Sequence, residues 1–426
     1  MNADMVKYSG VFLFYPKNNH KTTKLSGLLY RDTSGETIIE VFDRPEGGNL
    51  LEEHHKIVWG KVGNEDFSFF DVHLVFYSEY SSIKYSVKYA IQGRKMASIK
   101  ERRFNGCKIG IPHLIHWVNI PFSITCGQKE DPFISDNSSK PFLQTDLAKM
   151  KIQFFFNKSV SRTPNSVTYS KDCFVKCDSS NNQSVDDYLK LTTVISRFVS
   201  FAMLWKQECN FLELYAPNND TPYHIWLPVR ESSSLKRYHL FSFQDVKDKI
   251  HIMLQKWYKH YSELQPMVNQ LLFPLSYVDF DYIDFLRFAH ALEGLHKRFQ
   301  SNVFNRIAIE EKKSEEEDFY KARIKNLKDH LLNLKIISEC NIDENLVTKA
   351  RNKYTHLGIK DVKDDIPNDT LYLLALKCKV LLASSILLVL GLSEQEIENC
   401  THESELKNIV NHICAKESRA YHFNKT

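Results

Sequence analysis

The sequence predicts an α+β protein in which a β-rich, antiparallel N-terminal region is followed by an all-α helical bundle. Before about residue 175, short segments rich in aromatic and β-branched residues alternate with turn-forming residues. After about residue 279, apolar residues instead recur at helical spacing. The early strands have no helical crossovers between them, so we expect an antiparallel sandwich or barrel.

The length and composition predict several domains. A chain of 426 residues holds two or three domains at roughly 150 residues each. An aromatic content of 12% favours a sizeable sheet. We predict a β-rich domain at 1–180, a mixed α/β extension of it at 181–270 and a helical domain at 276–426, with the boundary marked by Pro266 and Pro274.

Within the N-terminal region, turn residues separate short segments of strand-forming composition. Ser184 and Asp187 have the spacing of a helix N-cap box, and apolar residues at helical spacing follow them. The expected strands are 10–15, 37–42, 67–76, 211–215 and 224–229, and the expected helices are 185–208 and 243–261.

The C-terminal region is expected to form five helices, at 279–300, 314–334, 343–357, 368–391 and 394–416. Its most apolar stretch, Tyr372 to Leu392, is interrupted by Lys377 and Lys379. The uninterrupted run 380–392 is too short to span a bilayer, so we expect a buried helix and no membrane segment.

Charge and cysteine content indicate the setting of the protein. The net charge is +4, but residues from 279 onward hold 22 Lys and Arg against 24 Asp and Glu, which leaves a net charge of +6 on the N-terminal part. If the protein binds RNA, that part can supply the attraction. Nine cysteines without a paired framework, and an N-terminus without a signal peptide, favour the cytoplasm.

The segment Arg351-Asn352-Lys353-Tyr354-Thr355-His356 holds the candidate catalytic residues. Asp343 can cap the expected helix 343–357, and Gly358 stands where a left-handed C-terminal cap is expected. On a helical wheel with Leu346 at 0°, the apolar stripe runs from about 0° to about 100°. Arg351, Asn352 and His356 fall outside this stripe, across about 140° of arc, and are expected to face away from the bundle.

These residue types suit the cleavage of an RNA phosphodiester. The reaction needs a proton acceptor for the 2′-hydroxyl, a proton donor for the leaving 5′-oxygen and positive charge at the phosphorus. Histidine can serve as acid or base near neutral pH, and arginine binds phosphate oxygens in a fork. The dipole at the end of the helix favours protonated His356, which points towards an acid or phosphate-stabilising role. No metal or other cofactor is expected.

The string Ala350-Arg-Asn-Lys-Tyr-Thr-His-Leu-Gly358 resembles the Arg-Asn…His-Gly signature of HEPN domains, although Leu357 separates the last two residues. The segment Ala291-Leu-Glu-Gly-Leu-His-Lys-Arg298 is similar to the first long helix of the Apea-like HEPN group. Ser9-Gly-Val-Phe and Leu25-Ser-Gly-Leu-Leu29 look like parts of the β-rich domain fused ahead of that module. The resemblance covers most of the chain.

This resemblance implies an RNA endonuclease of a bacterial antiphage abortive-infection system. It implies a HEPN homodimer and cleavage of host RNA, with tRNA as one class of target. The wide arc from Arg351 to His356 also favours a site shared between two chains across a two-fold axis. The β-rich region would bind a phage-derived trigger or hold the RNA. The alternative is a non-catalytic HEPN module that binds a nucleotide or a partner protein and regulates another protein.

Glu293 and His296 fall within the apolar stripe of the helix at 279–300. A carboxylate there needs a partner. Two interpretations are open. Either the two residues make a structural hydrogen-bond pair, or one of them reaches the motif helix and orients Arg351 or His356.

Two further groups are weaker candidates. The basic run with Arg94, Lys95, Arg102 and Arg103 is either a solvated hairpin or a contact for RNA or a partner. His113 and His116, with Cys107 nearby, could ligate a metal, but no second ligand pair follows them.

Overall fold

The computed structural model describes most of the chain. The described residues are 6–14, 22–42, 53–78, 82–93, 103–119, 140–163, 166–217, 221–227, 239–304, 316–355 and 366–423, with the backbone alone described for 157–163, 166–171, 316–318 and 419–423. The chain divides into two compact units, each described by itself below. The first unit holds Met1–Ile115, Phe122–Ser196 and Gln207–Leu235, and the second holds His116–Pro121, Arg197–Lys206 and Lys236–Thr426.

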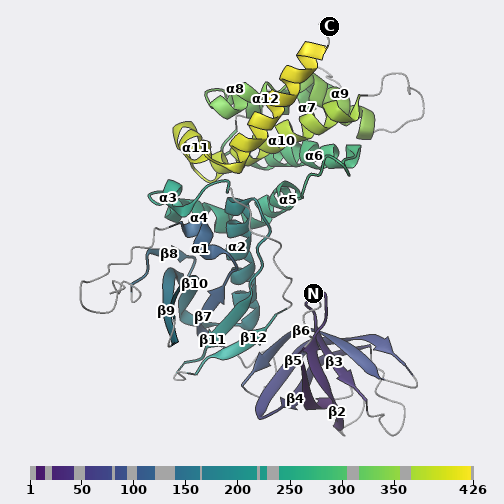
Figure 1. The fold of residues 1–426 in the computed structure, drawn as a ribbon, viewed down its shortest axis with the longest axis vertical. Coiled ribbons are helices and arrows are strands. Elements are labelled where there is room, and N and C mark those ends of the chain that lie inside the picture. Colours follow the sequence, from purple (N-terminus) through teal and green to yellow (C-terminus); the bar gives the residue numbers. More distant parts are fainter. Residues whose placement is uncertain are drawn as a thin grey trace. The chain divides into compact units, whose positions relative to one another are not determined.

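The first unit begins with a six-stranded antiparallel barrel, drawn in purple shades in Figure 1. The strands follow the order β3-β2-β1-β4-β5-β6, and pairing between β3 and β6 closes the ring. The predicted antiparallel sheet is thereby confirmed, and of the two architectures expected for it, a sandwich or a barrel, the structure has the barrel. The strands are β1 (Lys7–Phe14), β2 (Thr23–Arg31), β3 (Thr37–Val41), β4 (His54–Val62), β5 (Glu65–Tyr77) and β6 (Ile83–Gln92).

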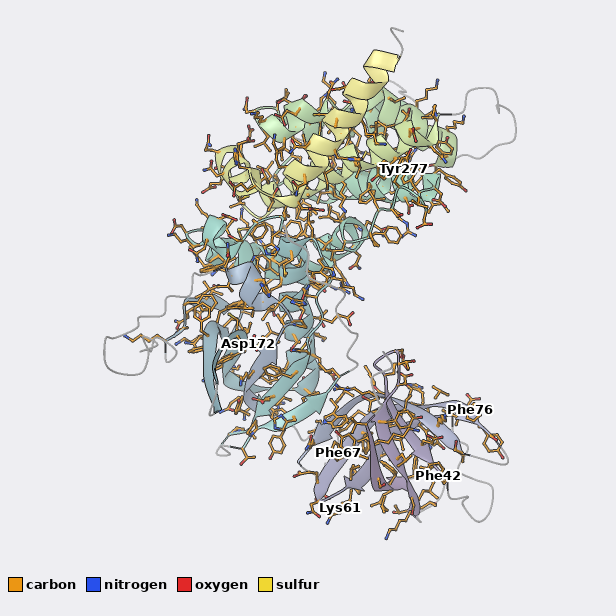
Figure 2. All side chains as sticks on the ribbon, in the orientation of Figure 1. Phe42, Lys61, Phe67, Phe76, Asp172 and Tyr277 are labelled. Atoms are coloured by element: carbon orange, nitrogen blue, oxygen red, sulfur yellow. The ribbon has the colours of Figure 1, made fainter. Side chains whose placement is uncertain are left out.

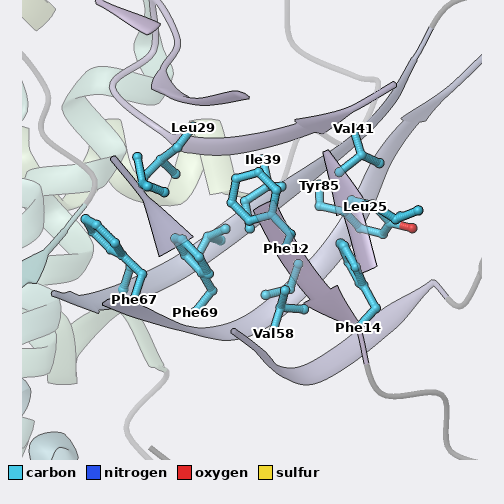
Figure 3. Close-up of a cluster of buried hydrophobic side chains, with 14 of the residues drawn as sticks. Phe12, Phe14, Leu25, Leu29, Ile39, Val41, Val58, Phe67, Phe69 and Tyr85 are labelled. Atoms are coloured by element: carbon cyan, nitrogen blue, oxygen red, sulfur yellow. The ribbon is translucent and has the colours of Figure 1, made fainter. Parts of the chain in front are cut away.

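Alternate side chains of these strands fill the barrel with aromatic and aliphatic groups (Figure 3). Phe12 and Phe69 are fully buried, with ring centroids 5.7 Å apart. Gly60 allows this packing, because a Cβ at that position would lie 2.8 Å from the ring of Phe69 and 3.0 Å from that of Phe12. The interior is therefore a close-packed apolar core.

The remaining strands extend the sheet from β6 in the order β12-β11-β7-β10-β9-β8. The first half of helix α2 (Val185–Met203) lies against this part, where the hydroxyl of Tyr188 donates to the carbonyl of Phe104 at 3.1 Å. The expected cap box is present, with Ser184 Oγ donating to Asp187 Oδ2 at 2.6 Å. The strands are β7 (Phe104–Gly110), β8 (Leu143–Leu147), β9 (Met150–Thr163), β10 (Ser166–Gln183), β11 (Phe211–Tyr215) and β12 (Tyr223–Trp226).

The second unit is helical and contains the predicted all-α bundle. Helix α10 is its core, because α10 packs against α5, α6, α8, α11 and α12. Besides α1 (Leu114–Val118), the helices are α3 (Phe243–Val246), α4 (Ile250–Lys259), α5 (Tyr261–Leu271), α6 (Tyr282–Phe299), α7 (Glu316–Asp329), α8 (Lys335–Cys340), α9 (Glu344–Thr355), α10 (Asn368–Val389), α11 (Glu394–Thr401) and α12 (Glu405–Phe423).

Helix α10 corresponds to the most apolar stretch of the sequence. Within the described residues it is the one helix long and apolar enough to cross a membrane, but 78% of its most apolar window is buried inside the protein. Gly391, at φ +96°, follows the helix and supplies the left-handed conformation that ends it. The burial confirms the prediction that this segment is a buried helix of the bundle.

Some helix boundaries differ from those predicted. The expected helix 243–261 is divided into α3 and α4, and a further helix, α5, begins at its last residue. Pro266 lies inside α5 rather than in a linker. Burial of Leu264, Met267, Val268 and Leu271 offsets the backbone hydrogen bond that Pro266 cannot donate. The expected helix 394–416 is two helices. Helices α3 to α5 belong to the second unit, together with the bundle. We had expected the boundary between the N-terminal region and the helical domain to lie after them, between residues 270 and 276.

Candidate active site

Helix α9 carries the first part of the sequence motif. The carboxylate of Asp343 caps the helix as expected, accepting from the backbone N–H groups of Asn345 at 2.9 Å and Leu346 at 3.2 Å. The helix is described as far as Thr355. His356 and Gly358 lie outside the described residues, so the structure places Arg351 and Asn352 of the motif but not its histidine.

Arg351 is packed into the bundle, which corrects the expectation that it faces away from it. The predicted stripe was centred near Ala350, yet Thr348, at about 200° on the same wheel, is only 2% exposed. The packed arc of α9 is therefore wider than its apolar stripe and includes Arg351, whose side chain is 15% exposed. The physical reason is that both α6 and α7 pack against α9, so two neighbours cover it rather than one.

The carboxylate of Glu293 on α6 joins three cationic side chains. Its Oε1 lies 2.7 Å from Lys297 Nζ and 2.7 Å from Arg323 Nη1 of α7, and its Oε2 lies 3.3 Å from Arg351 Nη2 of α9. Glu293 is 13% exposed, and it therefore has the partners that a buried carboxylate needs. The sequence left two interpretations open, a structural hydrogen-bond pair or a contact with the motif helix. Glu293 makes the contact with the motif helix, through Arg351.

This cluster has a net positive charge, because three cations surround one anion. Partial burial alone would raise the pKa of Glu293, but the hydrogen bond and charge of Lys297, with the charges of Arg351 and Arg323, lower it below its ordinary value. Glu293 is therefore ionised at neutral pH. The remaining positive charge makes the junction of α6, α7 and α9 attractive to a phosphodiester.

Two neighbours fix the guanidinium of Arg351. Asn352 Oδ1 accepts from Arg351 Nη1 at 3.0 Å, and Arg351 Cζ lies 5.1 Å from the centre of the Tyr320 ring. Tyr320 is itself fixed, since its hydroxyl donates to the carbonyl of Ala289 at 3.1 Å. Arg351 Nε is buried and has no hydrogen-bond partner within the described residues. The group is thus held in position with one donor unused.

His296 does not contact the motif helix. It is fully buried, and its Nε2 lies 3.1 Å from Asn326 Oδ1 of α7. Burial lowers the pKa of His296, as does the charge of Arg323, so its imidazole is neutral inside the bundle. This geometry fits a structural hydrogen bond between α6 and α7 rather than contact with the motif helix.

The structure brings a further histidine to the motif helix, which the sequence analysis missed. His290 of α6 has an exposed side chain, and its Nε2 lies 3.5 Å from Thr355 Oγ1 at the end of α9. His290 precedes Glu293 by three positions, and this spacing places both on one helix face. This spacing could have identified His290 from the sequence as a neighbour of Glu293. It does not reveal which helix packs against that face.

The weaker candidates gain little from the structure. Arg94, Lys95 and Arg102 lie outside the described residues, and Arg103 is exposed just before β7. Throughout the part of the chain that the structure describes, no group of three or more His, Cys, Asp or Glu side chains could hold a metal ion.

Comparison with known protein families accounts for both parts of the chain. The family described as ApeA N-terminal domain 1 matches residues 7–257, which is more than half of the chain. The family described as Apea-like HEPN matches residues 286–396, which include Glu293, Arg351 and His356. No curated protein and no solved structure matches the chain. The chain belongs to the ApeA-like HEPN proteins, and its function is HEPN-based and defence-related.

Proposed function

We propose that the protein is a metal-independent endoribonuclease of a bacterial antiphage abortive-infection system, which cleaves host RNA in the cytoplasm when triggered. The HEPN domain, at 276–426, is the catalytic part, and tRNA is the first class of target to test. One observation carries the proposal. Arg351 lies in a cluster of three cations around Glu293, five residues before His356 in the sequence.

The proposed chemistry assigns a role to each residue of the motif. Arg351 stabilises the charge that develops on the phosphoryl oxygens, since preorganised cations act most strongly on such charge. Asn352 and Glu293 hold the guanidinium in position through their contacts of 3.0 Å and 3.3 Å. His356 donates a proton to the leaving 5′-oxygen. The nucleophile is the 2′-hydroxyl, so the products carry 2′,3′-cyclic phosphate ends and no metal is needed.

We further propose that the active unit is a homodimer formed through the HEPN domain. Five positions on an ideal helix separate two side chains by about 140°, so the sequence spacing of Arg351 and His356 favours two facing copies, in which the Arg of one meets the His of the other. Sedimentation at the concentrations used for cleavage tests this. A monomer whose rate of cleavage is linear in protein concentration would contradict it.

The N-terminal region, with domains at 1–180 and 181–270, is proposed to bind the phage-derived trigger or to hold the RNA. The barrel offers a groove of about 600 Å³, lined by Ser9, Val11, Leu13, Lys24 and Lys61. Lys61 is exposed on the barrel (Figure 2). Replacing Lys24 and Lys61 with glutamate should abolish triggered growth arrest and leave the bundle folded. Unchanged arrest would remove the groove from the proposal.

The alternative function is a non-catalytic HEPN module that binds a nucleotide or a partner protein. The burial of Arg351 favours it, because the guanidinium is 15% exposed and already paired with Glu293. In that case the cluster would stabilise the junction of α6, α7 and α9. Neither the wild type nor a variant at Arg351 or His356 would then produce new RNA ends.

RNA end-mapping in bacteria that express the full-length chain decides between the two functions. Wild type should produce new RNA ends and arrest growth. Arg351→Ala should reduce cleavage by about 10²–10³-fold, and His356→Ala by about 10²–10⁴-fold. Arg298→Ala is the matched control, since Arg298 is exposed on α6 and contacts Met267 rather than Glu293.

The purified chain provides the test of metal independence. Cleavage in excess chelator should match cleavage without it. If chelation stops cleavage and a divalent ion restores it, the 2′-hydroxyl mechanism is wrong. If wild type produces no new RNA ends, the non-catalytic alternative is favoured.

A further inference from the structure

His290 on α6 is exposed to solvent at the edge of the candidate active site. Its contact with the end of α9 in the described part of the chain, between Nε2 and Thr355 Oγ1, has the long separation of 3.5 Å. A hydrogen bond of that length is weak. The imidazole is therefore held only loosely to the end of α9, and it remains accessible to a group that arrives from solvent.

The surroundings of His290 are those of the candidate active site. Arg351 from α9 and Glu293 from its own helix both interact with its charge. Arg323 of α7 reaches the same region through its contact with Glu293 at 2.7 Å. His290 thus belongs to the junction of α6, α7 and α9, although it is not part of the Arg351–His356 motif.

We infer that His290 is a second acid–base residue of this site and accepts the proton of the RNA 2′-hydroxyl. The inference rests on the proposed ribonuclease function and extends it. Cleavage by internal transesterification needs one group that takes up a proton and one that gives one. His356 is assigned the second task above, and His290 is a histidine from another helix that can perform the first.

An imidazole nitrogen of His290 takes the proton from the 2′-hydroxyl while the 2′-oxygen forms a bond to phosphorus. The bond from phosphorus to the 5′-oxygen breaks, and that oxygen leaves with its electron pair and takes a proton from His356. The products are a 2′,3′-cyclic phosphate and a 5′-hydroxyl. His290 then loses its proton to water and His356 regains one.

The electrostatics suit the role of a base. Partial burial lowers the pKa of His290 below its ordinary value, and the charge of Arg351 lowers it further, while Glu293 acts in the opposite direction. The imidazole is therefore largely neutral at pH 7, with a free nitrogen to accept a proton.

The test compares the full-length wild type with His290→Gln and His290→Ala, using His251→Gln as the matched control. His251 is exposed on α4, a different helix of the same unit. Both His290 variants should cleave RNA about 10²–10⁴-fold more slowly, which is the usual effect of losing a general base. They should also lose the rise in rate with pH on the acidic side, and added imidazole should partly restore the rate of His290→Ala.

The outcomes separate this inference from the proposed function. If wild type cleaves and the His290 variants match it in rate and pH profile, His290 is not the base and the ribonuclease assignment stands. If the variants are slow but keep the pH profile and do not respond to imidazole, His290 acts structurally and the inference is wrong. If wild type cleaves no RNA, both fail.

Discussion

The barrel and the bundle differ in the side chains that they bury. The barrel core is apolar, whereas the bundle also holds charged side chains between its helices. The barrel interior holds the fully buried rings of Phe12, Phe14, Phe69 and Tyr85. The junction of α6, α7 and α9 instead holds a largely buried carboxylate with three cations. Charges are costly to bury, so such a cluster inside a helical bundle is a candidate for function rather than for stability.

The comparison makes opposite predictions for substitutions in the two regions. A change in the barrel core should alter the free energy of unfolding and leave the chemistry of folded protein intact. A change at the junction should alter cleavage more than stability.

Phe69→Ala should destabilise the barrel by about 3–5 kcal/mol, because it leaves a cavity beside Phe12 and Phe67. The measurement is denaturant unfolding of the full-length chain. Phe76→Ala is the control, since Phe76 is 47% exposed on β5 (Figure 2) and its loss should change stability by no more than about 0.5 kcal/mol. Equal effects of the two substitutions would show that the barrel core is not close-packed.

Glu293→Gln should reduce cleavage by up to about 10²-fold, because small displacements of a positioned catalytic group have effects of that size. Loss of the carboxylate frees Arg351 from its contact at 3.3 Å and leaves three cations facing one another. The readout is the rate of RNA cleavage, alongside denaturant unfolding.

Glu339→Gln is the matched control for that substitution. Glu339 also contacts a lysine, Lys407, at 2.6 Å, but it lies on α8. Its loss should leave cleavage unchanged. If both substitutions reduce cleavage equally, the cluster around Glu293 has no special part in positioning Arg351.

The smallest effect concerns pH. Burial lowers the pKa of His296 below its value of 6.5 in an unfolded chain, so the unfolded state binds the proton more readily. The contribution of His296 to stability is therefore complete well above pH 6.5 and is lost as pH falls below it. His296→Gln should weaken the decline in stability between pH 7 and about pH 5, measured by denaturant unfolding. An unchanged decline would mean that His296 already titrates freely in the folded protein.

Several local features of the fold could be predicted from the amino-acid sequence. Aromatic and β-branched segments predicted strands at 37–42 and 67–76, and the structure has β3 and β5 there. Ser184 and Asp343 were predicted as caps and make the cap hydrogen bonds. Such features depend on residues a few positions apart, and local chemistry decides them. The position of Arg351 and His356 in the chain was likewise evident from the motif.

The surroundings of Arg351 could not be predicted in this way, because they depend on how distant helices pack. Its partner Glu293 is 58 residues away in sequence, and Thr355 lies 65 residues from His290. A helical wheel shows which residues share a face but not how many helices cover that face. Because both α6 and α7 pack on α9, an arginine expected at the surface is held between them. The same limit applied to the barrel, where the pairing of β3 with β6 depends on how the whole sheet curves.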